Sequence, residues 1–138
     1  MNERIEKEND GNILEIENLH LEFRSHGIWR EVVKGVNFSL KKGETLGLVG
    51  ESGSGKSVSA LATMGLLDKN NSKITQGRIL FDSSVDLLQL SEKEMRKYRG
   101  GKIAMIFQEP MTSLNPVVKC GKQVVEMILQ HEDCSRKD

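Results

Sequence analysis

The chain has 138 residues, the length of one ordinary domain, and 37% of them are hydrophobic, a modest share for a domain that closes its own core. Twenty basic residues balance twenty acidic ones, so no strong electric field is expected to recruit nucleic acid or anionic lipid. Residues 1–12 are predicted to form a polar tail that lacks the features of an export signal. The longest apolar runs, such as 103–107, are far shorter than the roughly 20 residues that cross a bilayer.

The two cysteines, Cys120 and Cys134, have no second pair nearby that would complete a four-ligand metal site. The sequence allows a disulfide between them, but a chain without an export signal is expected to stay in a reducing compartment. We therefore predict free thiols.

The first part of the chain carries the alternation typical of half-buried strands. Segments 13–23 and 32–40 alternate apolar with polar residues, and the first of them has a break near Asn18. Residues 41–44 (KKGE) predict a turn. The short, nearly all-apolar segment 45–50 (TLGLVG) predicts a strand that is buried on both faces of a parallel sheet.

The middle of the chain changes to a helical period. Val58, Leu61 and their neighbours recur at the spacing of one helix face, which predicts a helix over 56–67. A loop is predicted over 70–77, and a further strand over 77–82.

Three more elements are predicted before the C-terminus. Ser91 and Glu94 have the spacing of a capping box, so a short helix is predicted from there to Gly100. Segment 102–107 (KIAMIF) predicts a second apolar strand. A proline-marked loop follows, and a last helix is predicted over 117–129.

Segment 50–57 (GESGSGKS), which we call the glycine-rich loop, matches the pattern G-x-x-x-x-G-K-[ST] between a predicted strand and a predicted helix. Its glycines let the backbone bring N–H groups close to phosphate oxygens, and the start of the helix adds a partly positive end. Lys56 would carry a full positive charge to the β and γ phosphates, and the Ser57 hydroxyl would ligate Mg²⁺. The alternative is a turn that only links strand to helix. The residues predicted to bind a nucleotide are Gly50, Glu51, Ser52, Gly53, Ser54, Gly55, Lys56 and Ser57.

Segment 103–116 (IAMIFQEPMTSLNP), taken together with the glycine-rich loop and the segment before it, closely resembles the ATP-binding subunits of ATP-binding-cassette (ABC) importers of the oligopeptide, dipeptide and nickel group. The resemblance runs from about Leu14 to about Leu129. It implies an α/β fold in which a P-loop NTPase core adjoins an antiparallel β subdomain, with a helical subdomain that starts after the Q-loop. The strand predicted over 77–82 would belong to the antiparallel part.

On this resemblance, Gln108 falls on the family's Q-loop glutamine, which reaches the Mg²⁺ and the attacking water when the site closes. Lys56 and Gln108 are therefore the expected catalytic residues, and Ser57 and Gln108 the expected metal ligands. Phe23 falls where the family places an aromatic ring that stacks on adenine. Trp29 is the competing candidate, because spacing alone does not choose between the two rings.

The resemblance also implies cofactors, partners and a location. The cofactors would be ATP and Mg²⁺. The partners would be integral-membrane permease subunits, a second ATP-binding subunit that is identical or paralogous, and, indirectly, an extracytoplasmic solute-binding protein. The subunit would sit peripherally on the cytoplasmic face of the cell membrane and act on no nucleic acid.

The family's signature motif, its second acidic strand end and its switch histidine are not found in the sequence after Gln130. We therefore expect 13–138 to be the N-terminal part of an ABC ATP-binding domain, truncated after the Q-loop. Its fold would be incomplete, and the chain alone would be inactive and prone to aggregate.

Three alternatives stay open at this point. A stand-alone P-loop NTPase or kinase would need Asp82 or Glu109 on the metal. A non-transport ABC protein would act on DNA or ribosomes, against which the balanced charge counts. A non-catalytic nucleotide-binding fragment is compatible with the ABC resemblance.

Overall fold

The computed structural model describes residues 11–108 and 114–132. The chain divides into two compact units, Met1–Met95 and Arg96–Asp138, and each is described by itself.

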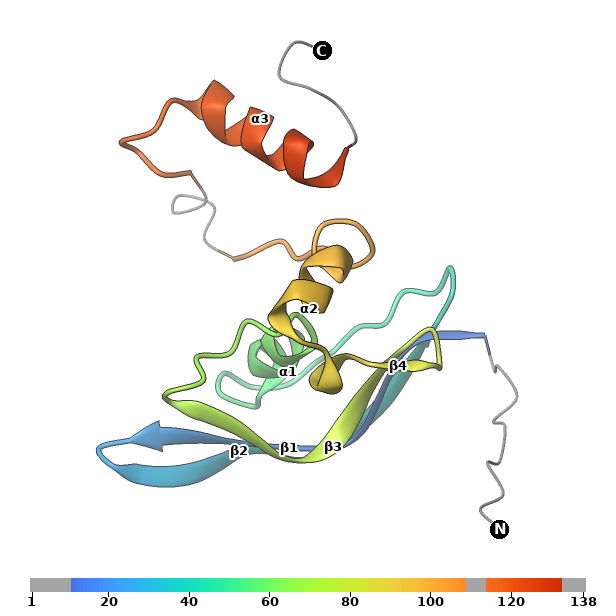
Figure 1. Ribbon diagram of the computed structural model, residues 1–138. Helices are drawn as coiled ribbons and strands as arrows, with labels where there is room; N and C mark the ends of the chain where they lie inside the picture. The colour runs from blue at the N-terminus through green and yellow to red at the C-terminus, as the bar shows by residue number, and fades with distance from the viewer. Residues whose placement is uncertain (1–10, 109–113, 133–138) are drawn as a thin grey trace. The chain divides into compact units, whose positions relative to one another are not determined.

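The first unit is built on one antiparallel sheet (Figure 1). Its strands are β1 (Asn12–Ser25), β2 (Ile28–Lys41), β3 (Ser72–Phe81) and β4 (Val85–Asp86), in the spatial order β2-β1-β3-β4. The strands predicted over 13–23, 32–40 and 77–82 are thus confirmed, and the last of these is in the antiparallel sheet, as expected. β3 begins earlier than predicted, so the prediction of a loop over 70–77 is wrong from Ser72 onward.

Strand β1 is bulged at the predicted break. Asn18 has a φ of 47°, and the pairing of β1 with both of its neighbours shifts between the residues on either side of it. Side chains alternate between the faces of a regular strand. Because of the bulge, Ile16 and Leu19 are both buried, at 2% and 0% exposure, although they are three residues apart.

The sheet therefore has an apolar and a polar face. The apolar face is formed by Ile16, Leu19, Leu21, Val33 and Ile79, all nearly inaccessible to solvent, and α1 lies over this side of the sheet (Figure 1).

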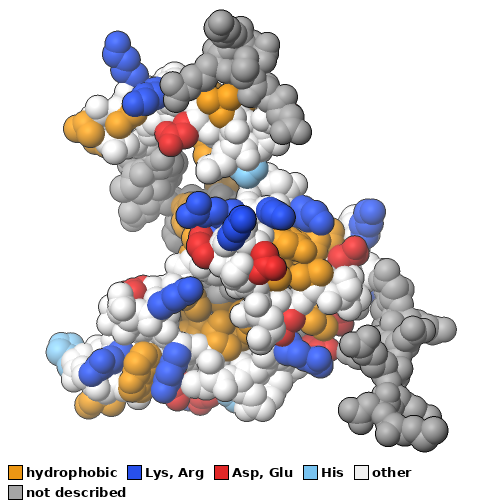
Figure 2. Space-filling view, in the orientation of Figure 1, with side chains coloured by type: hydrophobic (Ala, Val, Ile, Leu, Met, Phe, Trp, Pro, Cys, Tyr) orange, Lys and Arg blue, Asp and Glu red, His pale blue; other side chains and the backbone are white. Residues whose placement is uncertain are grey.

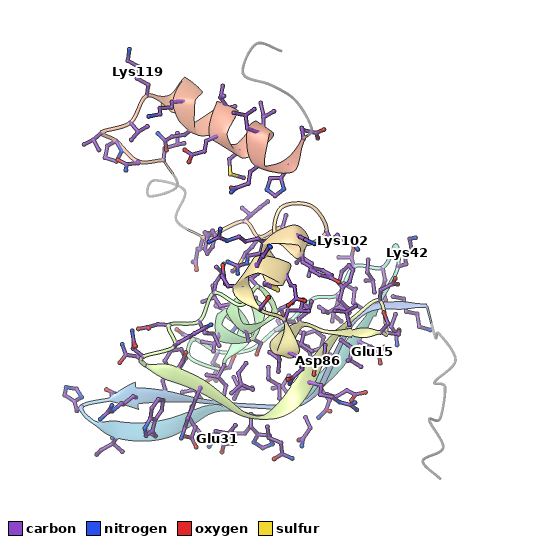
Figure 3. The ribbon with its side chains drawn as sticks, in the orientation of Figure 1. Glu15, Glu31, Lys42, Asp86, Lys102 and Lys119 are labelled. Carbon is purple, nitrogen blue, oxygen red and sulfur yellow. The ribbon has the colours of Figure 1, made fainter. Side chains whose placement is uncertain are left out.

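On the polar face, Glu31 projects away from α1 (Figure 3). This face carries three cross-strand pairs: Glu17 with Arg78 at 2.6 Å, His20 with Glu31 at 2.6 Å and Glu22 with Lys73 at 2.8 Å. One packed face and one solvated face are typical of an antiparallel sheet.

Helix α1 (Lys56–Thr63) confirms the helix predicted from Lys56, but it ends before Leu67. Gly65 has a φ of 61°; its N–H donates to the Ala62 carbonyl at 3.0 Å, and the Leu66 N–H donates to the Leu61 carbonyl at 2.9 Å. These two bonds are those of a Schellman motif, which satisfies the last carbonyls of a helix and stops it.

A 3-10 turn, η1 (Leu87–Gln89), precedes α2 (Glu92–Tyr98). The predicted capping box of α2 is confirmed: Glu94 Oε2 accepts from the Ser91 N–H at 2.8 Å, and the Ser91 hydroxyl accepts from the Glu94 N–H at 3.4 Å.

In the second unit, α3 (Cys120–His131) confirms the last predicted helix. The side chain of Gln123 bonds to the backbone of Asn115 and Val118 and so fixes the entry to this helix. Cys120 is an exposed free thiol, and Cys134 lies outside the described residues.

The strands predicted over 45–50 and 102–107 are wrong. Residues 44–50 carry no strand, and in 102–107 Ile103 makes a single bridge to Arg99. An apolar run becomes a strand only where a neighbour supplies ladder hydrogen bonds, and neither segment has such a ladder within the described chain. Val49 and Ile106 accordingly remain 99% and 98% exposed. The parallel part of the predicted core is therefore not formed in this structure.

On the side of the molecule seen in Figure 2, basic, acidic and apolar side chains are interspersed, as the equal numbers of the two charges suggest. None of the helices in the described residues is long and apolar enough to cross a membrane.

Gly77 is where β3 crosses the bulge of β1, and a side chain there is expected to destabilise the sheet. Its φ is 108°, and a Cβ would lie 2.6 Å from the Asn18 carbonyl oxygen and 2.7 Å from that of Glu17. We predict that Gly77→Ala lowers the free energy of unfolding by about 3 kcal/mol or more.

The matched control is Gly27→Ala in the β1–β2 turn. Gly27 has a φ of 81°, but no atom of the described residues lies within 4 Å of its Cβ position, so only the left-handed backbone, about 1 kcal/mol, opposes the change. Urea denaturation of both variants measures the difference. Equal losses would show that the close approach at Gly77 has no energetic consequence.

Candidate functional site

The glycine-rich loop runs from the irregular segment after β2 into α1. Gly55 is the N-cap residue of α1 with φ 90° and ψ 0°, a left-handed conformation that glycine adopts without a steric cost. The Ser54 N–H donates to the Glu51 carbonyl at 3.2 Å, so the chain turns tightly before the helix starts.

Lys56 folds back over the loop instead of extending into solvent. Its ammonium donates to the carbonyl oxygens of Gly50 and Glu51, each at 2.7 Å, and to the Ser54 hydroxyl at 3.0 Å. These three bonds use the three donors of the ammonium. They fix one full positive charge directly above the backbone of the loop.

Gly50 provides the room for this arrangement. A Cβ at this position would lie 2.7 Å from Ser54 Oγ and 3.7 Å from Lys56 Nζ. Any side chain larger than hydrogen would therefore displace the Ser54 hydroxyl and, with it, one partner of the lysine.

The N-terminus of α1 is open to an anion. It has no side-chain cap and no acidic residue in its first turn, so the first backbone N–H groups have no partner within the helix. The helix dipole places partial positive charge at the same end. Both the N–H and the hydroxyl of Ser59 donate to the Gly55 carbonyl at 2.9 Å and hold this start in place.

Ser57 stands in the first turn of α1 and is exposed. Its hydroxyl makes no hydrogen bond within the part of the chain that the structure describes, so its oxygen is available to a cation held beside the loop. The donors of the loop and this one acceptor are the groups that a phosphate chain with its Mg²⁺ requires. The residues that could hold such a cofactor are therefore those of segment 50–57.

The two candidate rings for adenine lie on opposite faces of the sheet. Phe23 is half-buried and follows Leu21 by two residues, so it shares the apolar face, on the same side as α1. Trp29 pairs with Arg24 across β1 and β2 and shares the polar face with Glu31.

Cations surround Trp29. Lys73 Nζ lies 4.5 Å and the Arg24 guanidinium carbon 6.0 Å from the centroid of its ring. Contacts of this kind stabilise a ring and its neighbouring cations without any ligand. The position of Trp29 on the polar face is thus accounted for by its neighbouring cations.

Asp82 follows β3, which is antiparallel to β1, and has a φ of 51° in the turn toward β4. Its N–H donates to the Ile13 carbonyl at 2.9 Å. It therefore does not end a parallel core strand, where a stand-alone P-loop enzyme would need its metal-binding aspartate.

Gln108 belongs to the second unit and is exposed. Glu109, with most of the motif that follows, lies outside the described residues. The structure thus brings the residues of the glycine-rich loop together within the first unit, and Gln108 belongs to the other unit.

Sequence reasoning missed the residues that support the loop. A Cβ on Gly55 would lie 3.1 Å from Val33 Cγ2 and 3.2 Å from the Val32 carbonyl oxygen. Ser59, which bonds to Gly55, is 4% exposed. The buried alternation of β2 was visible in the sequence, but which of its residues would meet the loop was not.

Residues 33–137 match the ABC transporter family. The chain is 50% identical over 125 residues to the dipeptide transport ATP-binding protein DppD and, over the same length, to the oligopeptide transport ATP-binding protein OppD, both of Bacillus subtilis (strain 168). These alignments cover 91% of this chain and 37% and 35% of those proteins. The glutathione import ATP-binding protein GsiA of Escherichia coli (strain K12) is 46% identical over 132 residues, 93% of this chain and 21% of GsiA.

The chain thus spans about a third of the length of DppD and OppD. The family match covers both the glycine-rich loop and the segment around Gln108. The protein belongs to the ABC transporter family.

Proposed function

We propose that the chain binds Mg-ATP through the glycine-rich loop. The observation that carries this proposal is the ammonium of Lys56, fixed above the backbone of the loop by the Gly50 and Glu51 carbonyls, beside the uncapped N-terminus of α1. In this arrangement an oxygen of the β or γ phosphate would replace the Ser54 hydroxyl as the acceptor for one N–H of the Lys56 ammonium. Backbone N–H groups of the loop and of the first turn of α1 would bind the remaining phosphate oxygens.

The other site residues have roles around this cradle. Ser57 would offer its hydroxyl oxygen to Mg²⁺, which supplies charge compensation on the phosphates when it is bound. Phe23 would stack on adenine from the apolar face of the sheet. Gln108 would orient the attacking water with its side-chain amide, and together with Lys56 it forms the proposed catalytic pair.

In the protein as a whole, we propose that ATP hydrolysis powers the import of peptides or similar small solutes. This rests on similarity to the dipeptide, oligopeptide and glutathione transport proteins, of which the chain covers only a part. The partners would be membrane permease subunits and a second ATP-binding subunit, with a solute-binding protein acting through the permease. The location would be peripheral, on the cytoplasmic face of the membrane.

Lys56→Ala tests the binding proposal directly. The change removes the charged donor, and charge-assisted hydrogen bonds contribute about 1.5–3 kcal/mol each. We expect affinity for Mg-ATP to fall at least roughly a hundredfold, measured by isothermal titration calorimetry. Lys42→Ala removes the same charge from an exposed turn and should leave affinity unchanged. If Lys56→Ala binds like the parent chain, the site assignment is wrong.

Ser57→Ala separates the metal from the phosphates. We expect the variant to bind Mg-ATP about tenfold more weakly and to bind ATP in the presence of a chelator as the parent chain does, because only the metal ligand is lost. The ratio of the two affinities, from fluorescence titration with a labelled ATP, is the measurement. An equal loss with and without Mg²⁺ would assign Ser57 to the phosphates instead.

Phe23→Ala and Trp29→Ala distinguish the two rings. Stacking of a base on an aromatic side chain contributes about 1–3 kcal/mol, so Phe23→Ala should weaken ATP binding about tenfold while binding of inorganic tripolyphosphate is unchanged. Trp29→Ala should leave both affinities unchanged. The reverse result would make Trp29 the adenine contact and would mean that the hairpin presents its other face to the nucleotide.

A further inference from the structure

The glycine-rich loop is supported from below by strand β2. A Cβ built on Gly55 would lie 3.1 Å from Val33 Cγ2 and 3.2 Å from the Val32 carbonyl oxygen. Among the described residues, no other atom outside the neighbours of Gly55 in the chain lies within 4 Å of this position. Gly55 thus leaves no room for a side chain against the strand, and its φ of 90° orients the start of α1 from this point.

The two valines stand at an irregularity of the sheet. Leu21 pairs with Val33, but the next residue of β1, Glu22, pairs with Glu31, so Val32 is an extra residue on β2. A bulge of this kind bends a strand and re-aims its groups, and such bulges are frequent beside functional sites. Here it lets the carbonyl of Val32 and the side chain of Val33 meet the same glycine.

Val33 is only 2% exposed, whereas most of the loop (50–54 and Ser57) is exposed. The valine is therefore fixed by the packing of the apolar face, and the loop takes its position from a rigid partner. A cradle of backbone N–H groups binds phosphate well only if the groups already point at it. Positioned groups are sensitive to small shifts: in catalysis, a misplacement of about 1 Å lowers the rate by up to about a hundredfold.

We propose that the Val32–Val33 bulge is the positioning element of the glycine-rich loop, and that Val33 is a positioning residue for nucleotide binding. The inference rests on the proposed function. The branched side chain of Val33 holds Gly55 in its left-handed conformation, and through Gly55 it directs the first N–H groups of α1 and the backbone of Lys56.

Three variants of the full chain separate positioning from stability. Val33→Ala removes the wall against Gly55. Val33→Thr keeps the branched shape but buries a hydroxyl, which lowers stability. Leu19→Ala is the control, because it removes a fully buried side chain from the same face. Leu19 pairs with Val36 and has no atom within 4 Å of the Cβ position of Gly55. Urea denaturation gives the stability of each variant, and titration with Mg-ATP and with tripolyphosphate gives its affinity.

We expect Val33→Ala to bind both ligands roughly tenfold more weakly, because the phosphate cradle and not the adenine contact is disturbed. Val33→Thr and Leu19→Ala should lose stability yet bind both ligands within about twofold of the parent chain. If Val33→Ala does not fold, Val33→Leu takes its place with the same expectation, since it keeps the apolar bulk and moves the branch away from Gly55.

The inference is overturned if Val33→Ala binds like the parent chain, or if Leu19→Ala loses as much affinity at equal stability. Failure of the proposed function gives a different result, in which the parent chain itself does not bind Mg-ATP or Lys56→Ala binds it unchanged.

Discussion

The apolar face of the sheet is continuous only because its strands are bulged. Ile16 and Leu19 are three positions apart and would face opposite sides of a regular strand. Both are nevertheless buried on the same face, because the bulge at Asn18, which has a left-handed conformation, adds one residue to β1. Gly77 of β3 approaches this bulge so closely that only a hydrogen fits. The register of β1 and β3 is therefore fixed by one point of backbone contact as much as by the hydrophobic pattern.

Because of this constraint, the two faces of the sheet have different roles. The polar face is occupied by paired charges, and Trp29 lies among its own cations there. The apolar face is left to carry α1, the support of Gly55 and the ring of Phe23. A one-residue slip in β1 would exchange Phe23 with its polar neighbours, so the register of the sheet decides which aromatic ring can face a nucleotide.

The sequence allowed those features to be predicted whose cause is local. The alternation of 13–23, the capping box at Ser91 and the glycine-rich loop each depend on residues within a few positions of one another, and the structure has them. The strand predictions at 45–50 and 102–107 were wrong because a parallel strand depends on partners far away in the sequence. An apolar run indicates burial but does not identify the strand that would pair with it. The close approach of Val33 to Gly55 joins residues 22 positions apart. It depends on a bulge that the local amino-acid composition does not reveal.

The loop and the sheet contribute unequally to the proposed nucleotide site. The ammonium of Lys56 and the carbonyls that hold it lie within seven residues, so the charge of the cradle is assembled by the loop itself. The direction in which this cradle points is not set by the loop alone. A left-handed glycine can turn the start of a helix in more than one way, and the neighbouring strand selects one of them. Phe23 and Val33 lie on adjacent strands of the same apolar face, with Leu21 directly opposite Val33. In the proposed mode of nucleotide binding, the sheet therefore sets the distance between the base on Phe23 and the phosphates on the glycine-rich loop.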